Sequence, residues 1–195
     1  AVLGDGTQVV VKVRKPGVDS TLKVDLAFLL VASKLIEFIT PGISSLSLAN
    51  IVSDIRDSML DELDFRKEAQ NILSFREFLA ANQINDATAP KPYLAYSGSR
   101  VLTMEYLEGV PLVDLDRIKG IVSDPPSVLL SALRTWAATV ASHDQFHADL
   151  HAGNLLVLSD GRIGFIDFGV VGKISESFRS AAKNLFNAVV EVCCR

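Results

Sequence analysis

The spacing of apolar residues changes along this chain and predicts where strands and helices form. A β-branched run, Val9 to Val13, follows a Gly4-Asp5-Gly6 turn, which predicts a β-hairpin over residues 1–13. Further along, apolar residues recur every three or four positions, which is typical of helices with one buried face. The helices expected from this pattern cover residues 19–39, 48–60, 61–80 and 129–143, and a last one begins near Ser175.

Short apolar runs between turn-forming residues predict further strands. They are expected at residues 93–96, 101–104, 155–158 and 162–166. Residues 82–92 are polar, contain two prolines and are expected to form a loop. The break at Gly109-Val110-Pro111 marks the boundary that we expect between two lobes, residues 1–108 and 109–195. The pattern therefore predicts an α+β fold with a small sheet and inserted helices in the first lobe.

The segment from Leu22 to Ile39 is the most apolar of the expected helices. No run in the chain reaches the roughly 18 uninterrupted apolar residues that a membrane span needs. Four charged residues interrupt this segment: Lys23, Asp25, Lys34 and Glu37. We therefore interpret it as a core helix, with a helix that lies on a membrane surface as the alternative.

Composition and charge exclude several classes of protein. Hydrophobic residues make up 49% of the 195 positions and charged residues 22%, which is typical of a folded globular chain and not of a disordered one. The 23 acidic and 19 basic residues give a net charge of −4, so no nucleic-acid partner is expected. Cys193 and Cys194 are adjacent, which indicates a reduced, intracellular compartment, with a vicinal redox pair as the alternative.

A polar cluster after the helix at 129–143 carries the candidate chemistry. Asp149 and Asn154 have the Asp-x-x-x-x-Asn spacing of the protein-kinase catalytic loop, and Asp167-Phe168-Gly169 follows the next hairpin. Phosphoryl transfer uses a divalent cation held by hard oxygen ligands, which Asn154 and Asp167 can supply. Asp149 can orient or deprotonate an attacking oxygen.

Two histidines in the same cluster leave another chemistry open. His147 and His151 flank Asp149, and these three residues together could form a zinc site. The alternative for each histidine is a hydrogen-bonded position in a loop. We favour the kinase-like interpretation because it also accounts for Asn154 and Asp167.

The first half of the chain supplies matching parts. Lys12 lies in the strand Val-Val-Val-Lys-Val, which resembles the kinase strand whose lysine contacts the α- and β-phosphates of ATP. The segment from Thr103 to Gly109 is a strand followed by a break, as in a kinase hinge. There the backbone of Glu105 and Leu107 would contact adenine, and Met104 would be the gatekeeper.

Taken together, these motifs resemble the UbiB (aarF) family of atypical, kinase-like proteins. The matching segments follow the family's order over nearly the whole chain: 11–18, 62–69 with Asn71, 103–106, 146–154 and 167–169. The resemblance implies a two-lobed protein-kinase-like fold with a truncated helical second lobe. It also implies that Glu68 pairs with Lys12, and that Glu62 and Asp64 form the family's Glu-x-Asp motif inside the helix at 61–80.

Departures from ordinary protein kinases narrow the expectation. Ala148 replaces the arginine of the catalytic loop, and a helix is expected soon after Gly169 with no long activation segment. The family also has a nucleotide-covering loop and a Lys-x-Gly-Gln segment that do not occur in these residues. We therefore expect this chain to be truncated at both ends and to show little or no turnover by itself.

The resemblance implies an ATP- and Mg²⁺-binding domain, with ATPase or non-protein phosphotransferase activity linked to quinone or isoprenoid lipids. A small-molecule kinase of the aminoglycoside or choline type and a nucleotide-binding pseudokinase scaffold are the alternatives. The expected partners are a nucleotide and an isoprenoid lipid or a membrane surface. The expected location is a plastid or mitochondrion in a eukaryote, or the inner membrane in a bacterium.

Overall fold

The structure is a computed structural model that describes residues 1–40, 47–175 and 180. Its helices are α1 (Val18–Ile39), α2 (Leu48–Asp61), α3 (Phe65–Ala81), α4 (Leu115–Ile118) and α5 (Pro125–Ser142). Two short 3₁₀ helices are η2 (Leu94–Tyr96) and η3 (Ala152–Asn154). The helix expected beyond Ser175 and the cysteine pair lie outside the described residues.

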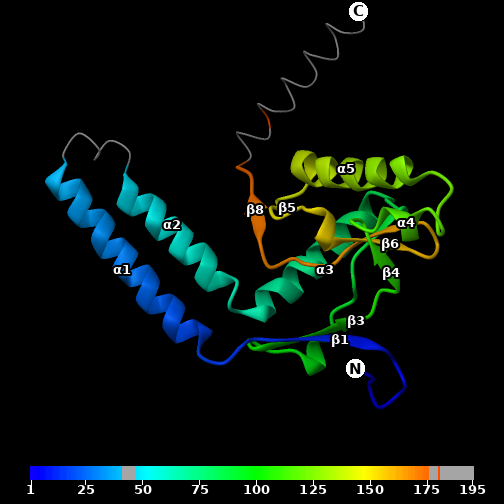
Figure 1. The fold of residues 1–195 in the computed structure, drawn as a ribbon, viewed down its shortest axis with the longest axis horizontal. Coiled ribbons are helices and arrows are strands. Elements are labelled where there is room, and N and C mark those ends of the chain that lie inside the picture. The colour runs from blue at the N-terminus through cyan, green and yellow to red at the C-terminus, as the bar shows by residue number, and fades with distance from the viewer. Residues whose placement is uncertain (41–46, 176–179, 181–195) are drawn as a thin grey trace, which may run out of the picture.

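The strands of the described residues form three small sheets, and Figure 1 shows where most of them lie. β1 (Val9–Val13) pairs antiparallel with β3 (Val101–Glu105), and β5 (Gln145–His147) pairs antiparallel with β8 (Val171–Lys173). The third sheet has the order β2-β7-β6-β4, with bounds Ala87–Thr88, Ile163–Phe165, Leu155–Leu158 and Gly109–Pro111. The expected α+β class is therefore confirmed.

The structure overturns two local expectations and refines two others. Residues 94–96 form η2 instead of a strand, because the Tyr96 carbonyl accepts a hydrogen bond from the Thr103 hydroxyl and the chain turns there. The hairpin expected over residues 1–13 is present: Val2 and Gln8 form an antiparallel bridge, and the Val9 N–H donates to the Ala1 carbonyl at 2.9 Å. Its second strand, β1, also pairs with β3. The expected loop at 82–92 contains β2, which pairs parallel with β7. The helix expected at residues 129–143 is confirmed as α5, but it begins earlier, at Pro125, because proline suits the first turn of a helix.

The helix expected over residues 61–80 is interrupted at its start. Helix α2 ends at Asp61, and α3 begins at Phe65. Asp64 is the N-cap of α3, and its side chain accepts a hydrogen bond from the Arg66 N–H at 3.0 Å. An N-cap residue has non-helical backbone angles, so one continuous helix cannot pass through Asp64. The Glu-x-Asp motif therefore lies in the junction between α2 and α3.

The buried face of α3 organises the core. Its apolar residues Ile72, Phe75, Phe78 and Leu79 belong to one cluster that also contains residues from β3, β6, β7 and α5. The ring centroids of Phe75 and Phe165 lie 5.1 Å apart, which joins α3 directly to β7. Because β3, which pairs with β1, contacts α3, and β7 leads into Asp167, this core sets the relative positions of the candidate site residues.

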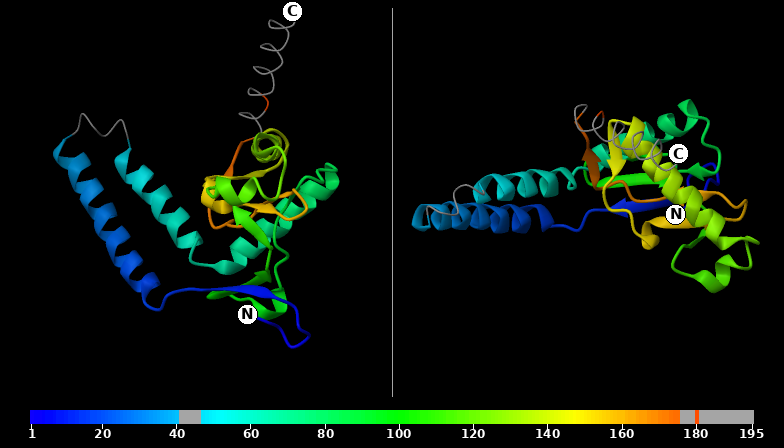
Figure 2. Two further views of the ribbon diagram at one scale, coloured as in Figure 1. Left: turned by 45° about the vertical axis from the view of Figure 1, so that its right-hand side comes forward. Right: turned by 90° about the horizontal axis from the view of Figure 1, so that it is seen from above.

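Helices α1 and α2 form a hairpin that extends away from the rest of the chain (Figures 1 and 2). Only Leu26 and Ser33 of α1 are buried, so the expectation of a core helix is wrong. Exposed apolar residues follow the opposite side of α1 with spacings of four, three, four and three: Val24, Phe28, Val31, Leu35 and Phe38. We call these five residues the outer stripe. No helix among the described residues is long and apolar enough to cross a membrane.

The expected lobe boundary falls between two of the sheets. β3 ends at Glu105 in the sheet with β1, and β4 begins at Gly109 in the sheet with β6. The peptide between them, residues 106–108, is the connection from one sheet to the other. The division into lobes at residue 108 stays a prediction, and the connecting segment is where the candidate site opens.

Candidate functional site

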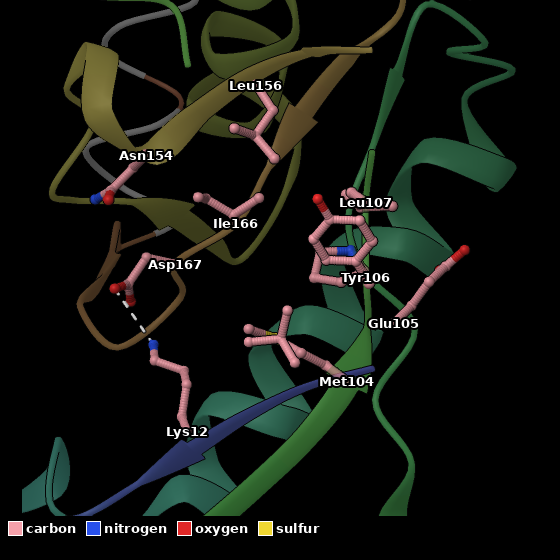
Figure 3. Close-up of a pocket in the computed structure, with 11 residues that line it drawn as sticks. Lys12, Met104, Glu105, Tyr106, Leu107, Asn154, Leu156, Ile166 and Asp167 are labelled. Atoms are coloured by element: carbon pink, nitrogen blue, oxygen red, sulfur yellow. Dashed lines mark ion pairs between the residues drawn. The ribbon is translucent and has the colours of Figure 1, made fainter. Parts of the chain in front are cut away.

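A cavity of about 330 Å³ opens between β1, the 104–107 segment and the residues that follow β7 (Figure 3). Apolar side chains cover most of its walls: Val10, Met104, Leu156 and Ile166. Three polar side chains gather at one end: Lys12, Asn154 and Asp167. Apolar walls with a few convergent polar groups are typical of small-molecule sites of this size.

Lys12 projects into the polar end of this cavity from the middle of β1. Its Nζ lies 2.6 Å from Glu68 Oε1 and 3.3 Å from Asp167 Oδ2. Burial alone would lower the pKa of Lys12, but the hydrogen bond and charge of Glu68 and the charge of Asp167 outweigh it and raise the pKa. Lys12 is therefore a fixed positive charge held between two carboxylates.

Glu68 reaches Lys12 from the first turn of α3. Its side chain is only 4% exposed, and burial raises its pKa even though Lys12 acts in the opposite direction. Its Oε1 atom also accepts a hydrogen bond from the Phe168 N–H at 3.5 Å. Glu68 thus connects β1, α3 and the Asp167-Phe168-Gly169 segment.

The opposite end of the cavity is formed by the expected hinge. Met104 is 5% exposed and lies beside the cavity at the end of β3. The Glu105 side chain turns away from the cavity, where its Oε2 accepts a hydrogen bond from the Lys91 N–H at 2.9 Å. Among the described residues, neither the N–H nor the C=O of Leu107 takes part in a backbone hydrogen bond. This segment therefore offers backbone groups at the cavity edge.

Asn154 and Asp167 flank two neighbouring strands of one sheet: Asn154 comes directly before β6, and Asp167 comes two residues after the end of β7. The Ile166 N–H donates to the Asn154 carbonyl at 3.1 Å, and Asn154 Nδ2 donates to the Asp149 carbonyl at 3.1 Å. Asp167 Oδ1 accepts the Gly169 N–H at 3.0 Å. The Asn154 amide oxygen and the second Asp167 oxygen are hard ligands that fit a divalent cation completed by waters and phosphates.

Asp149 stands beside this pair and is more exposed. Its side chain is 59% exposed, and His151 Nε2 lies 3.7 Å from its Oδ2. An exposed carboxylate next to the polar end of a cavity is accessible to an incoming hydroxyl group or water. Asp149 can therefore accept a proton or orient an attacking oxygen there.

Glu62, unlike Asp64, belongs to this group of acidic residues. Partial burial raises the pKa of Glu62, and the charges of Asp167 and Asp149 raise it further, so its carboxylate lies within electrostatic range of both. Asp64 instead pairs with Arg66 at 2.7 Å, beside its capping bond. The hydrogen bond from Arg66 lowers the pKa of Asp64. The two residues of the motif therefore face different surroundings.

The zinc alternative is not supported by the described part of the chain. His147 is 3% exposed, and its ring packs against Phe165 and Phe168 with centroid distances of 6.4 and 5.3 Å. Within residues 1–40, 47–175 and 180, no group of three or more histidine, cysteine, aspartate or glutamate side chains could hold a metal. His147 is also not a hydrogen-bonded loop histidine, because it ends β5 and neither of its buried ring nitrogens has a hydrogen-bond partner among the described residues.

Sequence reasoning gave no role to several residues that shape the site. Asn71 donates a hydrogen bond from its Nδ2 to the Phe168 carbonyl at 3.0 Å. Ile166 and Leu156 form an apolar wall of the cavity. Neither wall residue has a signal in the sequence, because an apolar strand residue looks the same whether it faces a cavity or the core. For Asn71, its place three residues after Glu68 was the available signal.

Comparisons with known proteins agree on one family. A family model described as the ABC1 atypical kinase-like domain matches residues 1–192. An uncharacterized chloroplastic aarF domain-containing protein kinase of Arabidopsis thaliana is 53% identical over 173 residues, covering 88% of this chain and 32% of the relative. A probable protein kinase UbiB of Cellvibrio japonicus is 32% identical over 183 residues, covering 91% and 32%.

A solved structure supports the fold independently. The complex of Rv3197 with erythromycin, from Mycobacterium tuberculosis, has a TM-score of 0.69 and 31% identity. The match covers 89% of this chain and 42% of that protein. The chain thus spans about a third of the length of the two curated relatives above.

Proposed function

The chain belongs to the family of ABC1 atypical kinase-like domains, and from this premise we propose that it binds ATP with Mg²⁺ in the cavity at Lys12 and Asp167. The observation that carries the proposal is the arrangement of that cavity. Lys12, paired with Glu68 and Asp167, lies at its polar end. Asn154 and Asp167 supply hard oxygen ligands there, and the Met104–Leu107 segment lines the other end. A nucleotide has the same polarity, with an apolar base and a charged triphosphate.

Each residue has a role in this proposal that follows from its surroundings. Lys12 contacts the α- and β-phosphates, and Glu68 orients Lys12. The backbone of Glu105 and Leu107 contacts the adenine, beside Met104. Asn154 and Asp167 hold Mg²⁺, which when bound neutralises charge on the phosphates. These assignments rest on the contacts described above and on the family's motifs.

The proposed reaction is slow ATP hydrolysis or transfer of the γ-phosphate to a non-protein acceptor. Asp149 takes the proton from water or from an acceptor hydroxyl, and the oxygen of that group forms a bond to the γ-phosphorus. The bond between the γ-phosphorus and the β–γ bridging oxygen breaks, and ADP leaves with that oxygen. The acceptor that we propose belongs to quinone or isoprenoid lipid metabolism, which is what the resemblance to the UbiB family implies. We propose that full activity requires a chain as long as the curated relatives above, of which the present chain covers about a third.

Thermal unfolding with nucleotide tests this proposal directly. We expect ATP with Mg²⁺ to raise the melting temperature, and ATP with a chelator to have a smaller effect, because ligand that binds only the folded state stabilises it. GTP serves as the control for the base. No shift at millimolar ATP with Mg²⁺ would contradict the proposal.

A small-molecule kinase is the second candidate. The observation that favours it is that a solved structure with 31% identity holds a small molecule, erythromycin. Incubation of the protein with γ-labelled ATP and a panel of hydroxylated small molecules separates this candidate from an ATPase. A nucleotide-binding scaffold predicts binding with neither hydrolysis nor transfer, and a complementation assay would then tolerate loss of Asp149.

The outer stripe of α1 supports a lipid partner. Its five apolar side chains face solvent, with Phe28 71% and Phe38 83% exposed. We propose that this face contacts a membrane surface, with the protein in a plastid if the source is a plant, as for the chloroplastic relative. A mitochondrial location in another eukaryote and the bacterial inner membrane remain the proposals for other sources.

A further inference from the structure

We propose that Asn71 is a positioning residue that, together with Glu68, holds the backbone of Phe168 and so fixes the direction of Asp167. This inference rests on the proposed function, because Asp167 matters only if the cavity binds a metal–nucleotide complex. Asn71 does not line that cavity, so its effect is exerted entirely through Phe168.

Three side chains of α3 contact three different groups of one residue, Phe168. Asn71 Nδ2 donates to the Phe168 carbonyl at 3.0 Å, and Glu68 Oε1 accepts the Phe168 N–H at 3.5 Å. The Phe75 ring lies 5.0 Å from the Phe168 ring, centroid to centroid. Residues 68, 71 and 75 are three and four positions apart, so they share one face of the helix. The helix therefore binds both polar backbone groups and the side chain of Phe168.

Phe168 is also connected to the candidate metal ligand Asp167, and Asp167 is connected through Lys12 to Glu68. Asp167 precedes Phe168, and its Oδ2 lies 3.3 Å from Lys12 Nζ. Lys12 Nζ in turn lies 2.6 Å from Glu68 Oε1. Lys12, Glu68, Phe168 and Asp167 thus form a closed ring of contacts, and Asn71 attaches the carbonyl side of that ring to α3. If the carbonyl were released, the peptide after Phe168 could rotate and take Gly169 with it.

The chemistry of the contact explains why an amide is required. A carbonyl oxygen needs a donor, and the Asn71 amide supplies an N–H while remaining neutral. An aspartate of the same shape would place a negative oxygen against the carbonyl oxygen. A leucine would keep the volume and leave the carbonyl without this donor. Phe168 is 2% exposed, so the hydrogen bond acts on a residue whose ring cannot move freely.

The test is the affinity for ATP with Mg²⁺ of the Asn71→Asp and Asn71→Leu variants, measured by titration calorimetry at several pH values. At about pH 8 we expect both to raise the dissociation constant about tenfold relative to the parent chain. As the pH falls through the carboxyl range, the aspartate gains a proton and becomes a donor, so its deficit relative to the parent shrinks. The deficit of Asn71→Leu stays constant, and a residue with a purely structural role would not produce this difference.

Gln70→Glu is the matched control, because it adds the same charge to the neighbouring exposed position of α3. We expect its affinity to equal that of the parent. Parent-like affinity in Asn71→Asp would overturn the inference and leave the proposed function intact. The inference would also be overturned if the loss of affinity in Asn71→Asp relative to the parent were the same at every pH.

Hydrogen exchange separates this inference from the proposed function. Without any nucleotide, we expect the amides of Phe168 and Gly169 to exchange faster in Asn71→Asp than in the parent chain or in Gln70→Glu. If the parent chain does not bind ATP, the proposed function fails, and this measurement still decides whether Asn71 holds the segment. Unchanged exchange at both amides would overturn the inference.

Discussion

Lys12 and Glu68 are 56 positions apart in the sequence, and their side chains meet at 2.6 Å between Nζ and Oε1. The carboxylate is almost fully buried, whereas the lysine side chain remains 28% exposed. The two ends of the pair therefore respond differently to mutation. Loss of Lys12 leaves a buried acid, and loss of Glu68 leaves a lysine that can turn toward solvent.

Replacement Lys12→Met is expected to destabilise the protein in a pH-dependent way. Without the lysine, the raised pKa of Glu68 rises further, because burial remains and the favourable charge is lost. An acid whose pKa is raised in the folded state contributes stability below its unfolded pKa, and that contribution is lost as the pH rises through the folded value. Urea unfolding should therefore show a loss of about 3 kcal/mol near pH 8 and a smaller loss near pH 4.

Lys15→Met is the control for this experiment, because Lys15 is exposed and lies just after β1, in the segment that connects β1 to α1. Its stability should follow that of the parent chain at both pH values. If Lys12→Met were equally destabilised at both, the buried charge of Glu68 would not be the cause.

Replacement Asp167→Asn is expected to remove the dependence of nucleotide binding on Mg²⁺. The amide keeps the shape of Asp167 but supplies one neutral oxygen in place of a carboxylate, so the affinity for ATP with Mg²⁺ should fall at least about tenfold. Asp116→Asn is the matched control, since Asp116 is 98% exposed on α4. Calorimetry with and without Mg²⁺ measures the effect, and unchanged affinity in Asp167→Asn would count against the metal assignment.

Substitutions of Asp64 can distinguish a role in capping α3 from a role in ligand binding. Its side chain caps α3, so Asp64→Ala should cost about 1 kcal/mol of unfolding free energy, whereas Asp64→Asn, which can still cap, should cost little. Denaturant unfolding gives both values. Nucleotide affinity is measured in Asp64→Asn, and a large loss there at parent-like stability would assign Asp64 a role beyond capping.

His147 should make the protein sensitive to mild acid. Burial lowers its pKa, so the folded state keeps the ring neutral while the unfolded chain takes up a proton below its ordinary pKa. Stability should fall as the pH decreases through about 6.5, with a slope of at most about 1.4 kcal/mol per pH unit from this residue. The variant His147→Phe should lose that part of the slope, and His151→Asn, changed at an exposed position, should retain it.

Vesicle flotation tests the proposed membrane contact of the outer stripe. We expect the protein to float with neutral phosphatidylcholine vesicles, and the double variant Phe28→Ser, Phe38→Ser to remain at the bottom of the gradient. α1 carries two lysines and three acidic residues, so anionic lipid should add little. The control is Val113→Ser with Leu115→Ser, which removes exposed apolar side chains elsewhere. Equal flotation of both double variants would refute the contact.

The order of the candidate motifs was readable from residue types alone. Lys12 in a β-branched strand, the five-residue spacing of Asp149 and Asn154, and Asp167-Phe168-Gly169 are local patterns, and local patterns survive without a fold. The α+β class followed in the same way, because apolar periodicity reports which face of a segment is buried. The same reasoning placed α1 correctly but misjudged its burial. The helix has apolar residues on two faces, and periodicity cannot tell whether another element covers the face with the outer stripe.

Only the tertiary structure decided which residues meet. The contacts of Phe168 with Asn71 and Glu68 join positions 97 and 100 apart, and no spacing rule connects them. The enclosure of His147 by Phe165 and Phe168 likewise depends on how β5, β7 and the following segment pack. The physical reason is that burial and long-range hydrogen bonds depend on the packing of distant elements, whereas a sequence pattern records only the preferences of neighbours. The chain thus specifies the parts of the candidate site locally, and the core built on α3 brings them together.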